Sequence, residues 1–260
     1  MDLGLENKVF IVSGGSKGIG EAISRALAEE GAIPIITGRS EEASLSLAEN
    51  LKQQGKKSQV ITCELSEEEN CKHVIQETIK KWGRIDGLVN NAGTNDGASL
   101  EKSTKDFIHS VQTNLFHYFY LAHYALPYLK ESKGSIVNIS SKTALTGQGG
   151  TSGYAASKGA QLALTREWAV ELLPHEIRVN AVIPSEVMTP QYEKWIKTFD
   201  DHEEQLKHIV KKIPLGHRMT QSEEIASMTV FLLSNKQSGH TTGQWIFVDG
   251  GYVHLDRALN

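Results

Sequence analysis

The sequence predicts one doubly wound α/β domain, in which helices cover both faces of a parallel sheet. Short runs rich in Ile and Val alternate with longer stretches of helical period along all 260 residues. The short runs show little polar alternation, as expected for strands that are buried on both faces. Strands that alternate with helices imply crossover connections between parallel strands. Since no linker, repeat or low-complexity tract divides residues 1–260, we expect a single domain.

Seven apolar runs are expected to be the strands, in the order 9–12, 33–36, 59–62, 87–89, 135–139, 179–183 and 245–248. Amphipathic stretches between them are expected to be helices, near 20–31, 41–54, 67–82, 104–131, 154–173 and 222–234. The region 185–220 interrupts this alternation after the sixth strand. Because ligands bind such sheets at the carboxyl ends of the strands, we predict that this region is a substrate lid.

The composition excludes several classes of protein. The chain carries 27 Lys and Arg against 31 Asp and Glu, with no basic block, which argues against nucleic-acid binding and a polybasic membrane anchor. No apolar run approaches the roughly 20 residues of a membrane span, and the first residues lack the order of a signal peptide, so we expect a cytoplasmic protein. The two cysteines, Cys63 and Cys71, and the histidines lack the spacing of metal ligands, so no metal is expected.

A glycine-rich turn follows the first expected strand and precedes a helix. Glycines let the backbone approach a diphosphate closely, and the amides at the start of the helix attract that anion. We therefore expect a dinucleotide to bind Gly14, Ser16, Lys17, Gly18, Ile19 and Gly20. The spacing departs from Gly-x-Gly-x-x-Gly, so a plain strand–helix turn is an alternative. The turn also matches the Gly-x-Ser-x-Gly elbow of α/β hydrolases, with Ser16 as the nucleophile, but an elbow normally lies on an interior strand well along the chain.

The residues after the second strand bear on the choice of cofactor. An acidic residue there usually holds the free ribose of NAD(H), whereas the additional phosphate of NADP(H) requires a cation. Gly38 stands where the acid is expected, Arg39 follows it, and Lys17 offers a second cation. We predict a preference for NADP(H), with NAD(H) as the alternative cofactor. A solvated or capping Arg39 would be the structural alternative.

Tyr154 and Lys158 stand four residues apart and therefore share one face of a helix. A free tyrosine titrates near pH 10, and a nearby cation lowers that pKa, so we expect Lys158 to make Tyr154 a better base. Ser141, at the end of the fifth strand, is placed to orient a substrate oxygen. A protein that binds a dinucleotide without catalysing a reaction is the alternative. Such a protein needs the glycine turn but not these three residues, so their presence argues against it.

Taken in order, these motifs resemble the short-chain dehydrogenase/reductase family over nearly the whole chain. The match comprises the glycine turn, Asn90–Gly93 after the fourth strand, Asn114 in the long helix, Ser141, and Tyr154 with Lys158. The resemblance implies a Rossmann-type domain with seven parallel strands, commonly a homotetramer, that transfers hydride between a nicotinamide and an alcohol or carbonyl. It implies that Tyr154 is the acid/base, Ser141 holds the reacting oxygen, Lys158 binds the nicotinamide ribose, and Asn114 positions a relay water.

Besides Arg39 and the glycine turn, the resemblance implies cofactor contacts at Glu64, Leu65, Asn91, Gly93, Tyr154, Lys158, Pro184, Val187 and Thr189. Three positions depart from the family pattern. Ser13 replaces the usual Thr, Glu64 replaces a usual Asp, and Ser185 replaces a Gly. Ser185 and the adjacent Glu186 add polar side chains near the nicotinamide, which suggests a hydrophilic substrate.

Three stretches, 140–149, 186–195 and 250–259, resemble the bacterial sugar dehydrogenases that oxidise L-fucose. This resemblance implies an aldose 1-dehydrogenase, which oxidises the anomeric hydroxyl to the lactone. The expected substrate contacts are Asn95, Ser141, Lys142, Gln148, Tyr154, Glu186 and Trp195, and a site that hydrogen-bonds hydroxyls rejects analogues that lack them. Alternatively Trp195 packs the lid and Lys142 is a solvated loop residue. A 3-oxoacyl or other ketone reductase of the same family is the alternative function.

Overall fold

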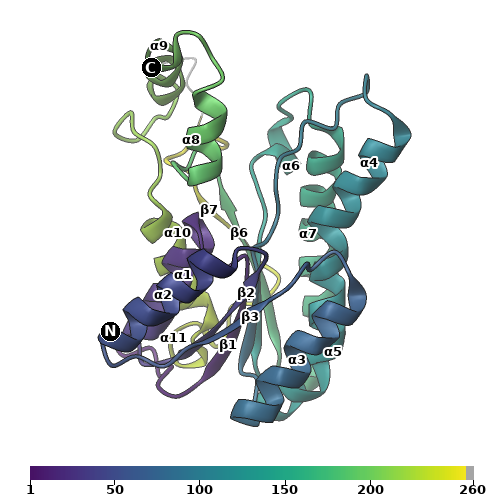
Figure 1. The fold of residues 1–260 in the computed structure, drawn as a ribbon, viewed down its shortest axis with the longest axis vertical. Helices are drawn as coiled ribbons and strands as arrows, with labels where there is room; N and C mark the ends of the chain where they lie inside the picture. Colours follow the sequence, from purple (N-terminus) through teal and green to yellow (C-terminus); the bar gives the residue numbers. More distant parts are fainter. Residues whose placement is uncertain (256–260) are drawn as a thin grey trace.

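The computed structural model describes residues 1–255, so the end of the stretch 250–259 lies outside the described part. Seven strands form one sheet, in which every neighbouring pair is parallel (Figure 1). The strands are β1 (Val9–Ser13), β2 (Ile33–Gly38), β3 (Gln59–Thr62), β4 (Gly87–Asn90), β5 (Ser135–Ile139), β6 (Arg178–Pro184) and β7 (Trp245–Val248). Their order across the sheet is β3-β2-β1-β4-β5-β6-β7. The predicted fold class is confirmed, and all seven strands lie where the apolar runs placed them.

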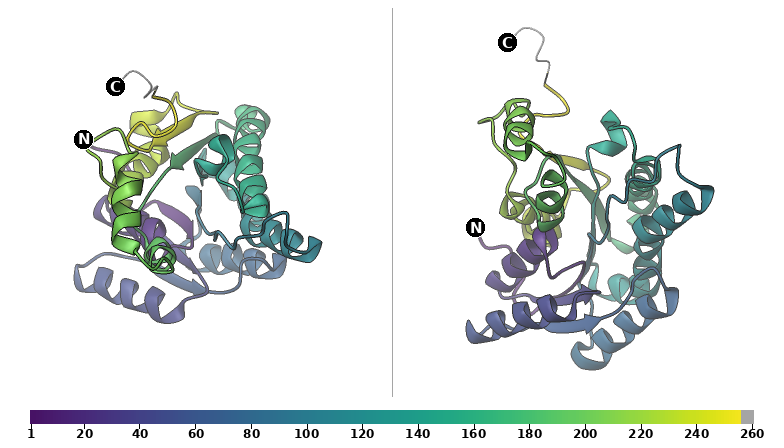
Figure 2. Two further views of the ribbon diagram at one scale, coloured as in Figure 1. Left: turned by 90° about the horizontal axis from the view of Figure 1, so that it is seen from above. Right: turned by 45° about the horizontal axis from the view of Figure 1, so that its top comes forward.

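The main helices are α1 (Gly18–Glu29), α2 (Glu41–Gln53), α3 (Glu68–Trp82), α4 (Thr104–Val111), α5 (His117–Ser132), α7 (Ser152–Glu171) and α10 (Ser222–Leu233). Helices α1, α2 and α10 cover one face of the sheet, and α3, α5 and α7 cover the other (Figures 1 and 2). The short helices α6 (Thr143–Thr146) and α11 (Asn235–Ser238) complete the loops after β5 and α10. The strand order changes direction between β1 and β4, which is where such sheets bind ligands.

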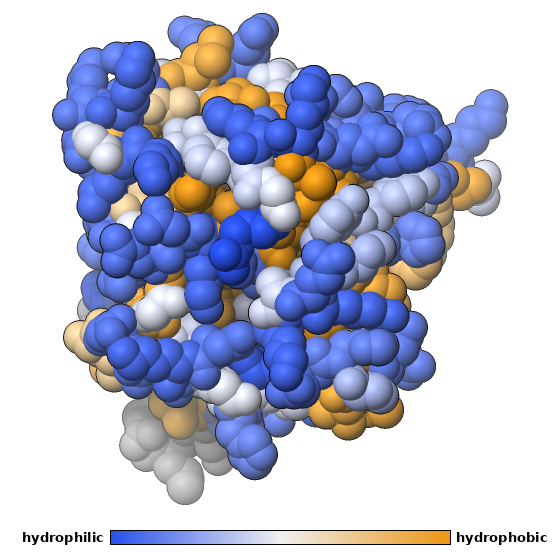
Figure 3. Space-filling view, turned by 90° about the horizontal axis from the view of Figure 1, so that it is seen from below, coloured by the Kyte–Doolittle hydropathy of each residue, from blue (hydrophilic) through white to orange (hydrophobic). Residues whose placement is uncertain are grey.

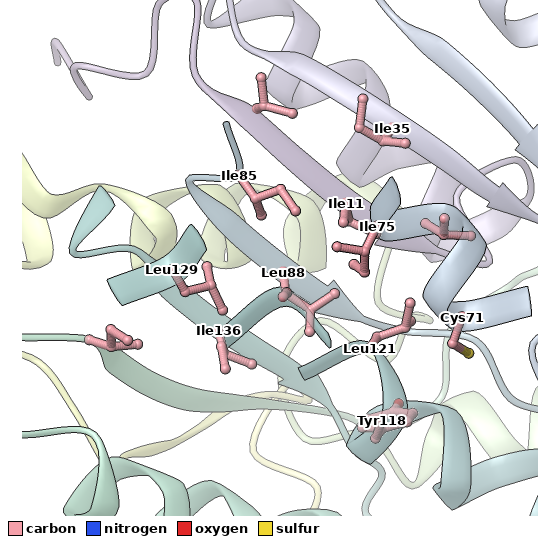
Figure 4. Packing of buried hydrophobic residues seen from close by; sticks show 14 of the residues in the cluster. Ile11, Ile35, Cys71, Ile75, Ile85, Leu88, Tyr118, Leu121, Leu129 and Ile136 are labelled. Carbon is pink, nitrogen blue, oxygen red and sulfur yellow. The ribbon is translucent and has the colours of Figure 1, made fainter. Parts of the chain in front are cut away.

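Both faces of the sheet are buried, which explains the continuous apolar strands. Successive strand residues point to opposite faces. Ile11 and Leu88 pack with Ile75 of α3 and Leu121 of α5 (Figure 4), whereas Phe10 and Val12 join a second cluster with side chains of α1 and α10.

The stretch 104–131, expected to be one helix, contains a π-helical turn. The turn covers Gln112–Phe116 and separates α4 from α5. It is held in part by the fully buried Asn114, whose side-chain nitrogen donates to the Ser110 carbonyl at 2.9 Å. Such turns occur frequently at functional sites. The prediction of an uninterrupted helix is therefore wrong, because helical periodicity does not reveal one inserted residue.

The region 185–220, expected to be irregular, contains α8 (Pro190–Ile196) and α9 (His202–Lys211). Both lie beyond the carboxyl ends of the strands (Figure 1). Thr189 caps α8 by accepting the Tyr192 amide at 3.2 Å, and the Gln191 side chain donates to the Thr94 hydroxyl at 3.0 Å. The segment thus contacts the loop after β4, although its role as a lid stays a prediction.

The opposite end of the molecule carries none of the predicted site. Hydrophilic side chains cover most of that face, with apolar residues between them (Figure 3). Across residues 1–255, no helix is long and apolar enough to span a bilayer. Nor do the described residues bring together three His, Cys, Asp or Glu side chains that could hold a metal ion.

Candidate active site

The glycine turn after β1 has a shape that side chains would obstruct. Gly14 and Gly18 have φ of +64° and +54°, in the left-handed region that favours glycine. A Cβ at Gly20 would lie 2.0 Å from the Gly14 carbonyl oxygen. Lys17 precedes α1 and makes no side-chain capping hydrogen bond. The first amides of α1 therefore lack a side-chain cap, as a site for a diphosphate requires.

The loop after β4 is tied to this turn at the point where the strand order changes. The Ser13 hydroxyl accepts the amides of Asn91 and Ala92 at 2.9 and 3.0 Å, so this side chain fixes the start of the loop to the end of β1. The Asn91 side chain donates to the Ser13 carbonyl at 2.9 Å. A Cβ at Gly93 would lie 2.8 Å from the Asn114 side-chain oxygen and 3.7 Å from the Lys158 ammonium. The cofactor loop therefore closely approaches two predicted catalytic residues.

Ser141, Tyr154 and Lys158 meet at the carboxyl end of β5, where α7 packs against the sheet. Ser141 is 9% exposed, and its Oγ accepts the Thr143 hydroxyl at 3.1 Å. The Lys158 Nζ lies 5.5 Å from the centre of the Tyr154 ring and donates to the Ile139 carbonyl at 2.7 Å. Asn114 is the fourth predicted catalytic residue, and its Oδ1 accepts the Thr94 amide at 2.7 Å.

The expected effect of Lys158 on the Tyr154 pKa is not found in this structure. Burial raises the pKa of Tyr154 to about 12, and a hydrogen bond with Ser141 offsets only part of that rise. Burial also lowers the pKa of Lys158 to about 7. The prediction is wrong for this state because desolvation dominates both pKa values, while the ammonium is directed to the Ile139 carbonyl.

Two buried polar residues at this site were missed by sequence reasoning. Gln161, one turn beyond Lys158 on α7, donates to the Asn114 carbonyl at 2.8 Å. Tyr118, fully buried on α5, donates to the Ile139 carbonyl at 3.0 Å and accepts from Lys158 at 3.4 Å. Gln161 follows Lys158 by three residues and so shares its helical face, a spacing from which its place at the site could have been predicted. Tyr118 had none, because its place depends on the π-helical turn before it.

The predicted cofactor residues near the adenosine end include an ion pair. Arg39 approaches Glu64 at 3.5 Å, with the two side chains 69% and 42% exposed. The other Glu64 oxygen accepts the Ser66 amide at 3.1 Å. Leu65 is buried in the core, so its side chain does not face solvent at this position.

The remaining cofactor residues lie at the end of β6. The Pro184 carbonyl accepts the Lys142 amide at 3.0 Å, and Val187 is 5% exposed. A Cβ at Gly18 would lie 3.2 Å from the Thr189 side chain, so the start of the predicted lid packs against the glycine turn.

The predicted substrate residues outside the catalytic group differ in how far they are buried. Lys142 and Glu186 form an ion pair whose side chains are only 10% and 13% exposed. Trp195 is 41% exposed and packs edge-on against Tyr192 and Phe199, both at 5.1 Å between ring centres. Gln148 is exposed in the loop before α7, and the Asn95 side chain accepts the Gly97 amide at 3.3 Å.

Comparisons with known proteins agree with this architecture. The family model for enoyl-(acyl carrier protein) reductase matches residues 14–253. The 3-oxoacyl-(acyl-carrier-protein) reductase FabG of Thermotoga maritima is 37% identical over 251 residues, covering 96% of this chain and 99% of that protein. The L-fucose dehydrogenase of Bos taurus, a mammal rather than a bacterium, is 34% identical over 246 residues, covering 94% of this chain and 88% of that protein.

Two solved structures are similar over almost their full length. The Cj0485 dehydrogenase has a TM-score of 0.94 and 49% identity, covering 100% of this chain and 99% of its own. Ligand-free aldohexose dehydrogenase of Thermoplasma acidophilum has a TM-score of 0.86 and 30% identity, covering 99% of this chain and 98% of its own. These matches overturn the hydrolase alternative, in which Ser16 would be the nucleophile, and the purely binding alternative. The chain belongs to the short-chain dehydrogenase/reductase family and is an NAD(P)-dependent oxidoreductase.

Proposed function

We propose that this enzyme oxidises an aldose, L-fucose or a related sugar, at the anomeric hydroxyl to give the lactone. The observation that carries the proposal is the largely buried Lys142–Glu186 ion pair, whose lysine directly follows Ser141 in the chain. Charged groups withdrawn from water need partners, and the hydroxyls of a sugar suit both charges, whereas an acyl chain suits neither. The similarity to an L-fucose dehydrogenase and an aldohexose dehydrogenase supports the same substrate class.

The proposed chemistry assigns one task to each residue of the site. The nicotinamide, when bound, accepts a hydride. Tyr154 takes the proton of the anomeric hydroxyl as the general base, and the Ser141 hydroxyl holds the reacting oxygen. Lys158 holds the nicotinamide ribose, and Asn114 positions a relay water. The glycine turn, Asn91, Gly93, Val187 and Thr189 surround the cofactor, and Asn95, Gln148 and Trp195 are further substrate contacts.

Reduction of a 3-oxoacyl or other ketone substrate is the second candidate function. It is favoured by the 37% identity to FabG across 99% of that protein. The same tyrosine would then donate a proton instead of accepting one.

An assay with both nicotinamides distinguishes these functions. We expect L-fucose, L-galactose or D-arabinose to be oxidised with a kcat/KM roughly 100-fold above that for a β-keto ester in the reductive direction, because a site lined with charged partners rejects substrates without hydroxyls. Production or consumption of the reduced nicotinamide is followed by absorbance. Turnover confined to the keto ester would contradict the sugar proposal.

We also propose that the enzyme prefers NADP(H), through Arg39 with Lys17. Changing Arg39 to Asp is expected to raise the Kd of NADPH about tenfold or more and leave that of NADH nearly unchanged, because a charge-assisted contact to the phosphate is lost. Glu64→Gln frees Arg39 from its ion pair and should tighten NADPH binding a few-fold. Fluorescence titration measures both. A strong NADH preference in the unmodified enzyme would refute the proposal.

The homotetramer, the cytoplasmic location and the lid remain predictions. Exposed apolar side chains on α4, α5 and α7 would be covered in such an assembly, including Ile108, Phe119 and Val170, which are 61%, 52% and 69% exposed.

A further inference from the structure

We propose that Lys142, Glu186, Tyr192 and Tyr252 form a subsite that holds two neighbouring hydroxyl groups of the substrate, away from the reacting carbon. The four residues come from four segments that meet at the carboxyl ends of the strands. This inference rests on the proposed function and extends it by naming the part of the sugar that these residues recognise.

The Lys142–Glu186 pair is fixed from both sides. The Lys142 amide donates to the Pro184 carbonyl at 3.0 Å, which joins the loop after β5 to the end of β6. The Glu186 carbonyl accepts the Thr220 amide at 2.9 Å, which joins it to the segment before α10. Because Lys142 directly follows Ser141, the pair lies one residue from the group proposed to hold the reacting oxygen.

Tyr252 extends the cluster from the segment after β7. Its ring centre lies 4.1 Å from the Lys142 ammonium. Asp249 shapes this segment by accepting the Gly251 and Val253 amides at 2.8 and 2.9 Å. The ring contacts the ammonium through its π face. This contact can orient Lys142 and leaves the Glu186 carboxylate able to accept a hydrogen bond from a substrate hydroxyl.

Tyr192, on α8, is linked to the cluster by its electrostatic interaction with Tyr252. Its Oη is buried and has no hydrogen-bond partner among the described residues, as is also true of the Oγ of Ser185, which precedes Glu186 in the chain. Burial, together with the interaction with Tyr252, raises the pKa of Tyr192 to about 12, so the hydroxyl keeps its proton. A buried hydroxyl without a partner is unfavourable, and a substrate hydroxyl would supply the missing hydrogen bond.

The chemistry of the cluster selects a neutral diol. An ammonium only donates hydrogen bonds and a carboxylate only accepts them, whereas each sugar hydroxyl does both. One hydroxyl can therefore accept from Lys142 while its neighbour donates to Glu186. A carboxylate substituent at this place would be repelled by Glu186. Buried ion pairs contribute little to folding stability, so recognition accounts better for this pair than stability does.

The test compares the aldose that the enzyme oxidises with analogues that each lack one ring hydroxyl. In the wild type, we expect loss of either subsite hydroxyl to lower kcat/KM about 100-fold. In Lys142→Met or Glu186→Gln, that penalty should fall below about tenfold for the same hydroxyl, because its partner is already gone. The Kd of NADPH, measured by fluorescence, should not change.

Tyr192→Phe provides a variant that is expected to fold normally, because the hydroxyl it removes has no protein partner. We expect an unchanged Tm and a roughly tenfold lower kcat/KM for the intact sugar. Tyr124→Phe is the matched control, since the Tyr124 hydroxyl donates to Glu68 at an exposed position on α5 and should not affect kcat/KM.

The outcomes separate the two proposals. A wild-type enzyme that oxidises no aldose contradicts the proposed function itself. If the wild type oxidises aldoses but the variants keep its full penalty for each missing hydroxyl, only the subsite is refuted. The subsite would also be refuted if the Lys142 and Glu186 variants had a lower Tm and lost kcat/KM equally for every analogue. The ion pair would then only hold segments of the fold together.

Discussion

Replacing Tyr154 with Phe is expected to lower kcat by roughly 1,000-fold or more, while NADP(H) binding stays close to that of the wild type. The change removes the proposed base and keeps the ring, whose centre lies 5.5 Å from the Lys158 ammonium. Packing around α7 should therefore be preserved. Steady-state kinetics give the loss of kcat, and fluorescence titration gives the Kd of NADPH. Substantial residual turnover would contradict the assignment of Tyr154.

The pH dependence provides an independent check of the same residue. Burial raises the pKa of Tyr154 to about 12, so at pH 7 to 10 most of the free enzyme carries a protonated tyrosine. Below the pKa, the deprotonated fraction of Tyr154 rises about tenfold for each unit by which the pH increases. Oxidation by the wild type should accelerate as the pH rises over this range, and the residual activity of Tyr154→Phe should not follow that rise.

The fold was predictable because burial on both faces leaves a direct trace in the sequence. Each strand is a run of adjacent apolar residues, as Phe10, Ile11 and Val12 illustrate by packing alternately into two clusters. The π-helical turn around Asn114 left no such trace. One inserted residue disturbs the apolar period less than ordinary variation in composition does.

The relative placement of two candidate site residues was predictable where neighbours in sequence are neighbours in space. Tyr154 and Lys158 share a helix face, so four-residue spacing was sufficient. The partners of Lys158 were hidden, because Tyr118 and the Ile139 carbonyl reach it only through the tertiary fold. The Tyr154 pKa was mispredicted for the same reason, since burial cannot be read from a motif.

Gly20 to Ala is expected to weaken NADP(H) binding about 100-fold or more, the effect of misplacing a binding group by about 1 Å. A Cβ at this position would lie 2.0 Å from the Gly14 carbonyl oxygen and 2.6 Å from the Asn91 side-chain nitrogen, so the turn has to move. Gly159→Ala is the matched control, because a Cβ there has nothing within 4 Å. Within α7 it should stabilise the fold by about 0.5–1 kcal/mol and leave binding unchanged. Fluorescence titration gives both Kd values and thermal unfolding gives both Tm values. Wild-type affinity in Gly20→Ala would show that the close approach of the glycine turn to the start of α1 does not build the dinucleotide site.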